Sequence, residues 1–400
     1  MRRWITTGLV FLLPIQPAFA LSAWTGESGS GDLRGLVRLM GSVLDYPVPT
    51  GLEQDDDQAG LLGRLVLQHT AGSLTLELNG YQTWLPLSLQ LGAVTGALDV
   101  ERSARLEWET SRARYAHLGL DRLSARWSLG WLDLSLGRQP INLATTFFFS
   151  PNDLFAPFSA QTFYRVYKPG VDAVRAEVQL SELTQLSLLG VLGYRPDPDS
   201  ITGWSETVDS DRHSTLARIT GNFAGLEWGM LTGKVRRERV HGVSLQGELF
   251  GRLGLRAEGQ QAVSLDGSRP RYTEWSISIE HRWESSLMLQ LEQYYHGRGA
   301  QTVAEYDPLN NRSGYLARRY QALGVSYEFS PLLNGQFSVL RNHVDHARLF
   351  NGNLIYSLSD ESELSVSFTL AEGKAPQGMT LQSEYGTLPQ LFSLEWRSYF

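Results

Sequence analysis

A period-two alternation of apolar and polar residues recurs along most of the 400-residue chain and limits its fold more than any other feature. Residues 275–280 read Trp-Ser-Ile-Ser-Ile-Glu, and residues 364–369 read Leu-Ser-Val-Ser-Phe-Thr. Successive side chains of a β-strand point to opposite faces of the sheet, so each such segment would carry one apolar and one polar face. The sequence therefore predicts an all-β protein.

The connections between these segments alternate in length. Tight turns at one end and longer loops at the other are typical of a transmembrane antiparallel up-and-down β-barrel. The short turns lie at 71–72, 181–184, 284–286, 330–335 and 359–361, and the longer connections lie near 47–60, 140–170, 195–213, 260–271, 297–314 and 374–388. We predict about 18 strands (roughly 16 to 20), near 33–43, 61–70, 73–84, 113–128, 131–139, 171–181, 185–194, 214–222, 226–239, 241–249, 253–260, 271–283, 286–296, 315–329, 335–344, 347–358, 362–373 and 388–400.

Two stretches are open to a second interpretation. The apolar residues of segment 33–44 also fit a helical stripe, so a short periplasmic or plugging helix is the alternative there. Residues 85–112 are assigned to a loop, although 103–109 could pair as a strand.

The first twenty residues have the features of a secretory signal peptide. Arg2 and Arg3 precede an apolar stretch, and Ala18-Phe19-Ala20 offers the small residues of a cleavage site. The apolar stretch is too short for a transmembrane helix. We expect residues 1–20 to be removed and residues 21–400 to form a single barrel domain in the outer membrane.

Composition excludes several classes of protein. The chain has no cysteine, which excludes disulfide scaffolds, Cys-ligated zinc, iron–sulfur clusters and attached c-type haem. A net charge of −7 argues against nucleic-acid binding, and 42% hydrophobic residues argue against disorder. A soluble β-sandwich also alternates, but it rarely needs this many strands, so the signal peptide and the loop asymmetry favour the barrel.

The C-terminal segment supports the same fold. Phe392, Leu394, Trp396 and Phe400 share one face of the last predicted strand, and the sequence ends on that Phe. This ending resembles the terminal strand of bacterial outer-membrane β-barrels, and the resemblance implies that Trp396 and Phe400 are read by the barrel-assembly machinery. Ser398 departs from the pattern, because a bulky apolar residue is usual there.

A motif in residues 137–175 resembles a broad group of Gram-negative porin-like proteins related to alginate-export barrels. The matching residues are Gly137-Arg138-Gln139, Pro151-Asn152-Asp153-Leu154-Phe155, Pro157 and Pro169-Gly170-Val171-Asp172-Ala173-Val174-Arg175. Relatives often carry Trp-Gly after Gly-Arg-Gln, whereas Leu143-Ala144 stands here. The resemblance implies an outer-membrane barrel, and functions differ within the group.

Arg138 is the residue of this motif that needs a physical explanation. Strict alternation would aim it at lipid beside Leu134 and Leu136, where a charge costs about 2–4 kcal/mol at mid-membrane. We expect a bulge at Gly137 to turn Arg138 inward, into an ion pair with Asp153 or Asp172 that pins the 140–170 loop. The alternative is an Arg138 that lies beyond the apolar band.

The 140–170 loop is unusually rich in Phe for an external loop, and folding into the lumen as a constriction would bury those rings. A structural pin without a transport role is the alternative. The candidate pore and constriction residues are Arg138, Gln139, Asp153, Asp172, Arg175, Phe148, Phe155, Arg122 and Arg126.

The polar faces of the predicted strands carry charges of both signs, so strong ion selectivity does not follow from the sequence. We expect Arg and Glu on neighbouring strands to brace the wall. The predicted lumen charges are Arg122, Arg126, Asp133, Arg175, Glu177, Arg218, Glu227, Glu248, Arg256, Glu258, Glu280, Arg282, Glu292, Glu328, Glu363, Glu395 and Arg397.

Metal and catalytic signatures are weak. Glu53 and Asp55–Asp57 lack the spacing of a calcium loop, and His343-x-x-His346 needs a turn to bring both rings together. We predict no catalytic residue, no metal site and no cofactor.

Three classes of function stay open. A channel for polar solutes is favoured, in contact with outer-membrane lipid and the barrel-assembly machinery. A barrel that sheathes a periplasmic or extracellular partner, such as a multihaem cytochrome, is the first alternative, and a barrel enzyme is the second.

Overall fold

The computed structural model describes residues 22–26, 29–47, 57–84, 101–111, 116–160, 167–197, 204–308, 314–378 and 380–400. The predicted signal peptide and the acidic residues Glu53, Asp55 and Asp56 lie outside this range. No helix among the described residues is long and apolar enough to cross a membrane.

Twenty antiparallel strands form one sheet in the described residues, and eighteen of them close into a barrel. Closure occurs where β2 pairs with β3 on one edge and with β20 on the other. The two strands outside the ring are β1, which pairs with the start of β2, and β5, which pairs with β6. The strands are β1 (Ala23–Gly26), β2 (Gly29–Asp45), β3 (Asp57–Ala71), β4 (Leu74–Trp84), β5 (Glu107–Ser111), β6 (Ala116–Ser128), β7 (Leu132–Gln139), β8 (Val171–Ser181), β9 (Thr184–Val191), β10 (Ser214–Phe223), β11 (Leu226–Val235), β12 (Glu238–Leu249), β13 (Leu253–Ser264), β14 (Tyr272–Arg282), β15 (Met288–His296), β16 (Arg319–Ser330), β17 (Leu333–Asn342), β18 (Arg348–Ser359), β19 (Ser362–Glu372) and β20 (Gln390–Tyr399).

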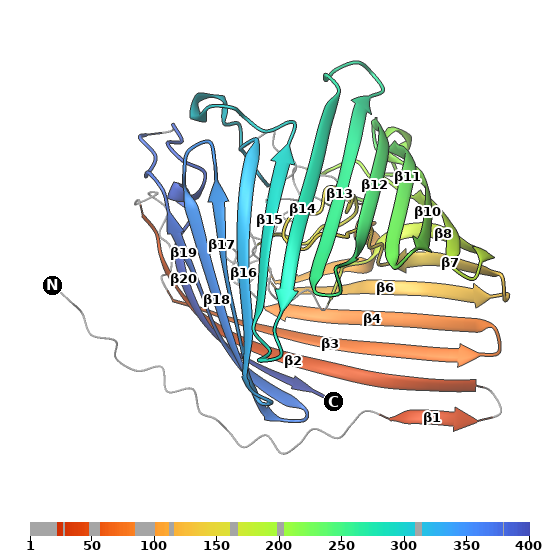
Figure 1. Ribbon diagram of the computed structural model, residues 1–400. Helices are drawn as coiled ribbons and strands as arrows, with labels where there is room; N and C mark the ends of the chain where they lie inside the picture. The colour runs from red at the N-terminus through yellow and green to blue at the C-terminus, as the bar shows by residue number, and fades with distance from the viewer. Residues whose placement is uncertain are drawn as a thin grey trace.

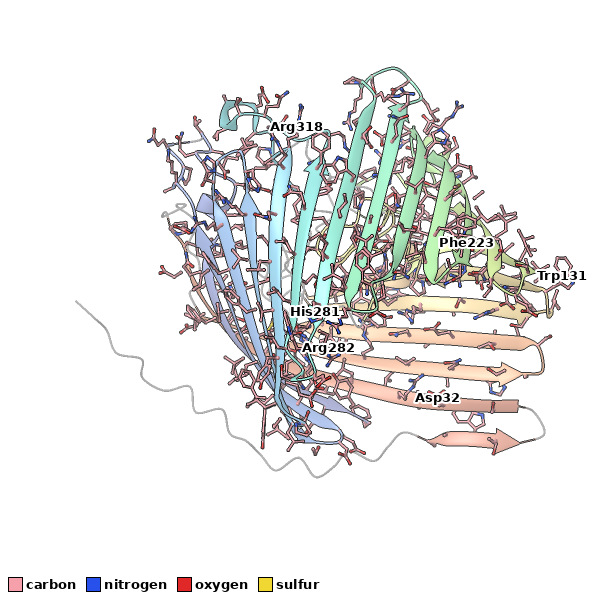
Figure 2. All side chains as sticks on the ribbon, viewed as in Figure 1. Asp32, Trp131, Phe223, His281, Arg282 and Arg318 are labelled. Carbon is pink, nitrogen blue, oxygen red and sulfur yellow. The ribbon has the colours of Figure 1, made fainter. Side chains whose placement is uncertain are left out.

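All the long connections lie at one end of the barrel, which also has the two-residue turn between β11 and β12, and the described connections at the other end are short. We call the end with tight turns, such as that between β3 and β4, the turn end, and the other the loop end. In Figure 1 the β2–β6 wall crosses the β12–β17 wall, because strands on opposite sides of a tilted barrel run in different directions. Figure 2 shows Trp131 and Phe223 beside the short turns, with Arg318 among the loops.

The outward face is apolar along the middle of the strands. Leu136 is exposed on β7, Val174 on β8, Val243 on β12 and Leu394 on β20, while their sequence neighbours turn toward the interior. This alternation of exposed apolar and inward polar residues confirms the predicted all-β up-and-down barrel.

One of the two open stretches is settled as predicted, and two expectations need correction. Segment 33–44 is part of strand β2, as predicted, and not the alternative helix, because β3 and β20 satisfy its backbone on both edges. Part of the predicted 85–112 loop is strand β5. The boundary predicted at residue 240 lies instead at a two-residue turn, Arg236-Arg237, where Arg236 adopts a positive φ of 55°. Neither turn residue is Gly, Asn or Pro, so the sequence carried no turn signal there.

Candidate functional site

The loop between β7 and β8 runs inside the barrel. Ile141, Leu143 and Phe155 are at most 4% exposed and join a cluster with inward-facing residues of the wall from β8 to β14. Those wall residues include Leu189, Leu216, Leu231, Val240 and Tyr272. Residues on both sides of the middle of the loop therefore lie against the inner surface of this wall.

The middle of the loop contacts a second part of the wall. Phe148 and Phe149 are buried among residues of β15 to β18, including Tyr320 and Leu340. Phe149 stacks on Tyr294 with ring centroids 4.8 Å apart. Phe147 is different, because its side chain is 38% exposed. The predicted burial of Phe148 and Phe155 inside the barrel is confirmed.

Two wall glutamates hold the loop by its backbone. Glu258 on β13 accepts hydrogen bonds from the N–H groups of Thr145 at 2.5 Å, Thr146 at 3.2 Å and Asn152 at 3.0 Å. The same type of contact holds the loop on β15.

Glu292 on β15 accepts hydrogen bonds from three consecutive N–H groups, those of Phe147 at 3.0 Å, Phe148 at 3.1 Å and Phe149 at 2.6 Å. Ser276 Oγ donates a fourth at 2.9 Å. Glu258 and Glu292 are both nearly fully buried, and each carboxylate is stabilised by charge-assisted hydrogen bonds. We call these two sites the carboxylate cradles.

A wall glycine makes room for the loop at its closest approach. A Cβ atom on Gly324 of β16 would lie 2.9 Å from Cζ of Phe148. A larger residue at this position would push the Phe148 ring out of its place.

Arg138 at the start of the loop turns away from lipid, as predicted. Gly137 has a φ of +112°, and a Cβ there would lie 2.2 Å from the Leu123 carbonyl oxygen, so only glycine fits. The register with β6 and β8 continues without a shift, so the inward turn comes from this backbone angle and not from the expected bulge.

The partners of Arg138 are acidic residues and carbonyl groups. Its Nε lies 2.8 Å from Asp172 Oδ1, and an Nη lies 2.9 Å from Glu107 Oε1. Further hydrogen bonds reach the carbonyl oxygens of Leu120 and Ser103. Of the two partners that the sequence proposed, Asp172 is therefore correct and Asp153 is not.

The ion pair belongs to a larger buried network. Arg102 contacts both Glu107 and Asp121, and Arg64 lies 3.0 Å from the second Asp121 oxygen. Three arginines thus balance three carboxylates, those of Glu107, Asp121 and Asp172. We call this set, with Arg138, the base network.

The far end of the loop is fixed by a third group of contacts. Asp153 pairs with Lys168, and burial lowers the pKa of Lys168 while the Asp153 carboxylate opposes that shift. Arg122 donates to the Lys168 carbonyl at 3.2 Å. The guanidinium carbons of Arg64 and Arg122 lie 3.5 Å and 4.5 Å from the centroid of the Tyr167 ring.

A pocket of about 170 Å³ lies against strands β3, β4, β6, β7 and β8, beside the start of the loop. It brings together Arg126, Gln139 and Arg175, which the sequence proposed separately, and its other lining residues are Gln68, Thr75, Glu77, Ser124, Ser135 and Pro140. The structure thus places the candidate residues in the pocket, in the base network and in the inward loop, with Arg122 at the contacts that fix the far end of the loop.

Several of the predicted lumen charges pair across neighbouring strands, as expected, whereas Arg175–Glu177 and Arg397–Glu395 pair within one strand. The pairs are Arg122–Glu77, Arg126–Asp133, Arg175–Glu177, Arg256–Glu280, Arg397–Glu363 and Arg397–Glu395. Glu258 and Glu292 differ from this expectation, since they bind backbone N–H groups of the loop. Glu107 was not predicted at all, because it falls in the stretch assigned to a loop.

The C-terminal residues complete the seam of the barrel. Trp396 on β20 pairs with Leu39 on β2, and the Phe400 N–H donates to the Gly35 carbonyl at 3.0 Å. Recognition of Trp396 and Phe400 by the assembly machinery stays a prediction.

The structure gives the His343–His346 turn no metal-binding geometry. Asp345 accepts hydrogen bonds from Tyr306 at 2.8 Å and from the Glu384 N–H at 2.7 Å. Among the residues that the structure describes, no group of three or more His, Asp or Glu side chains could hold a metal ion.

Comparisons with known proteins identify the fold. No family model and no curated protein matches the sequence. Among solved structures, OccAB4 of Acinetobacter baumannii has a TM-score of 0.59 at 11% identity, covering 92% of this chain and 98% of that one.

Two structures from Pseudomonas aeruginosa agree. OccK5 (OpdH) has a TM-score of 0.59 at 9% identity, covering 92% and 98% of the two chains, and OccK11 (OpdR) has 0.55 at 11% identity, covering 92% and 96%. These neighbours are Gram-negative outer-membrane porins. At such low identities the likeness establishes the fold.

Proposed function

We propose that this chain forms a water-filled channel through the outer membrane, by which polar solutes cross. The observation that carries the proposal is a closed barrel narrowed from within by a loop that two carboxylate cradles hold by its backbone N–H groups. A barrel with tight turns facing the periplasm would place the loop end at the cell exterior.

The inward loop also weighs against the alternatives. A sheath around a multihaem partner needs an open lumen, whereas two clusters of buried side chains fill one side of this one. A barrel enzyme would need Ser, His and an acid at the rim. His117 and His296 instead lie against Glu107 and Glu274, which also bind arginines.

We further propose that the channel prefers anionic solutes. In the wall pairs the guanidinium is usually the more exposed partner: Arg126 is 48% exposed against 24% for Asp133, and Arg38 is 41% exposed against 7% for Glu395. Arg122–Glu77 and Arg397–Glu363 are reversed. A solute in the lumen would therefore meet more positive than negative charge, despite the net charge of −7.

Single-channel recording in a planar bilayer tests the channel itself. Phe147→Ala removes the exposed ring from the loop and should raise the conductance, because the ring is positioned to narrow the path. Phe223→Ala, which removes a 77% exposed ring at a turn, is the matched control and should leave conductance unchanged. A silent barrel that co-purifies with haem would contradict the proposal.

Reversal potentials in a salt gradient test the charge preference. Arg126→Gln should shift the permeability ratio toward cations, whereas Arg237→Gln, at an exposed loop-end turn, should not. Equal permeability to both ions in the unmodified channel would refute the preference and leave the channel standing.

A further inference from the structure

Arginines gather on the outward face of three neighbouring strands at the loop end. Arg319 begins β16, Arg341 lies one residue before the end of β17, and Arg348 begins β18. Figure 1 shows these strands side by side. Leu340 and Leu349 point into the lumen cluster, so the residues next to them, Arg341 and Arg348, face outward.

The register brings two of these like charges together. Arg341 lies directly opposite Arg348, an arrangement that destabilises a sheet unless something neutralises it. Glu372 lies 3.7 Å from Arg348 in an exposed pair. Within the described part of the chain, neither Arg319 nor Arg341 has an acidic partner.

Two nitrogen atoms in this cluster are buried without hydrogen-bond partners among the described residues, Arg341 Nε and His343 Nε2. His343 follows β17 directly, and its backbone N–H donates a hydrogen bond to the Arg319 carbonyl at 3.0 Å. Burial, and after it the charges of Arg341, Arg319 and His346, lower the pKa of His343. Arg319 and Arg341 thus offer donors that no carboxylate of the described residues neutralises, and an anion would satisfy them.

The position of the cluster points to a lipid. Tyr295 pairs with Arg319 and stacks on Trp275 at 5.9 Å, which forms an aromatic pair of the kind found at membrane interfaces. Leu323 and Phe337 continue the same outward faces as exposed apolar residues. Arginines at this level reach the phosphates of lipid headgroups while their stems stay against the apolar chains.

The sign of the charge is local to this side of the barrel. Within the strands from β11 to β18, the outward ionisable residues near the loop end are basic, and they include Lys234 and Arg239 besides the three arginines. Glu372 on the next strand, β19, lies directly opposite Arg348 and ends this basic run, and Asp45 on β2 and Asp57 on β3 lie beyond it. This cationic face opposes the overall charge of −7.

We infer that the Arg319–Arg341–Arg348 face, with His343, binds the phosphate of an anionic lipid in the outer leaflet. The inference rests on the proposed outer-membrane location. The lipid would neutralise the opposed Arg341 and Arg348 and give acceptors to the unpartnered Arg341 and His343 nitrogens.

Lipid binding to the purified full-length barrel in neutral detergent tests this inference. The probes are bisphosphorylated lipid A, its dephosphorylated form and inorganic phosphate, with affinity measured by native mass spectrometry. The double variant R319Q/R341Q should bind lipid A about thirtyfold more weakly, since each cation near a charged lipid surface contributes about fivefold. The matched double variant R126Q/R282Q, which removes one lumen arginine and one arginine at the turn end, should bind like the unmodified protein.

Each other outcome decides the question. Equal binding by the two double variants, or equal binding of dephosphorylated lipid A, would overturn the inference. Competition by inorganic phosphate at concentrations equal to the lipid would show a free-anion site instead. If R319Q/R341Q does not fold, the unmodified protein still tests the idea, because its lipid A affinity should fall as salt rises.

Conductance recorded from the same preparation separates this inference from the proposed function. A barrel that conducts ions but does not bind lipid A would refute the lipid site alone. A silent barrel that binds lipid A through these arginines refutes the channel alone.

Discussion

The inward loop is held by two regions of opposite chemical character. At the start of the loop, the base network joins three guanidinium groups, including that of Arg138, to three carboxylates. At its middle, Glu258 and Glu292 have no cation as the main partner and bind backbone N–H groups instead. The first region joins four strands of the wall, and the second joins the wall only to the loop. The base network should therefore matter for barrel stability, and the carboxylate cradles should matter for the position of the loop.

Removing Arg138, the central cation of the base network, should give the largest loss of barrel stability. Arg138→Met leaves Asp172 and Glu107 buried beside a neutral side chain, which should lower the free energy of unfolding by about 3–5 kcal/mol. Urea unfolding in detergent micelles measures the loss. Arg126→Met, in the half-exposed pair with Asp133, is the control and should cost less than about 1 kcal/mol. Similar losses in both variants would show that the base network adds no stability.

Removing a carboxylate cradle should release the loop from the wall while the barrel stays folded. Glu292→Ala orphans three N–H groups, at a cost of about 3 kcal/mol if they stay buried and less if the loop moves into water. We expect a higher and noisier single-channel conductance. Glu280→Ala, on the lumen face of β14, is the control. A conductance equal to that of the unmodified channel would mean that something else holds the loop.

Filling the space beside Phe148 should disturb the same region by steric means. Gly324→Val should cost about 1–3 kcal/mol, because the added atoms overlap the Phe148 ring. Gly41→Val, at an outward position with no atom within 4 Å, should be tolerated. Thermal unfolding measures the difference between the two variants. Equal melting temperatures would show that the Phe148 ring does not occupy the space beside Gly324.

A further effect should come from pH. Glu384, in the loop after β19, accepts a hydrogen bond from Tyr320 at 2.7 Å, and Tyr320 packs near Phe149. Burial raises the pKa of Glu384 to about 7 from 4.5. Folding thus favours the protonated acid, so this residue's contribution to stability should be full below pH 4.5 and be lost as the pH rises to 7. Glu384→Gln should flatten stability measured across that range, and an unchanged slope would contradict the assignment.

The two regions also differ in how far the sequence could predict them. Arg138 sits at an outward position of an alternating strand, so its charge alone demanded an acidic partner, and Asp172 was one of two acids nearby in the motif. Glu258 and Glu292 occupy ordinary inward positions, and nothing local shows that a segment more than a hundred residues away donates its N–H groups to them. Strand number followed from alternation, whereas the turn at Arg236-Arg237 lacked the residues that mark turns.

The shortest loop-end connection has a consequence for engineering the protein. Arg236, in the two-residue turn between β11 and β12, reaches Glu101 at 2.6 Å and the Leu154 carbonyl of the inward loop at 3.1 Å. An inserted epitope there would pull the side chain from both partners. The connection 265–271 is exposed throughout, and Asp266 bonds only within its own turn, to Ser264 and Ser268. With the loop end at the cell exterior, as proposed, a tag or a domain for surface display belongs at 265–271.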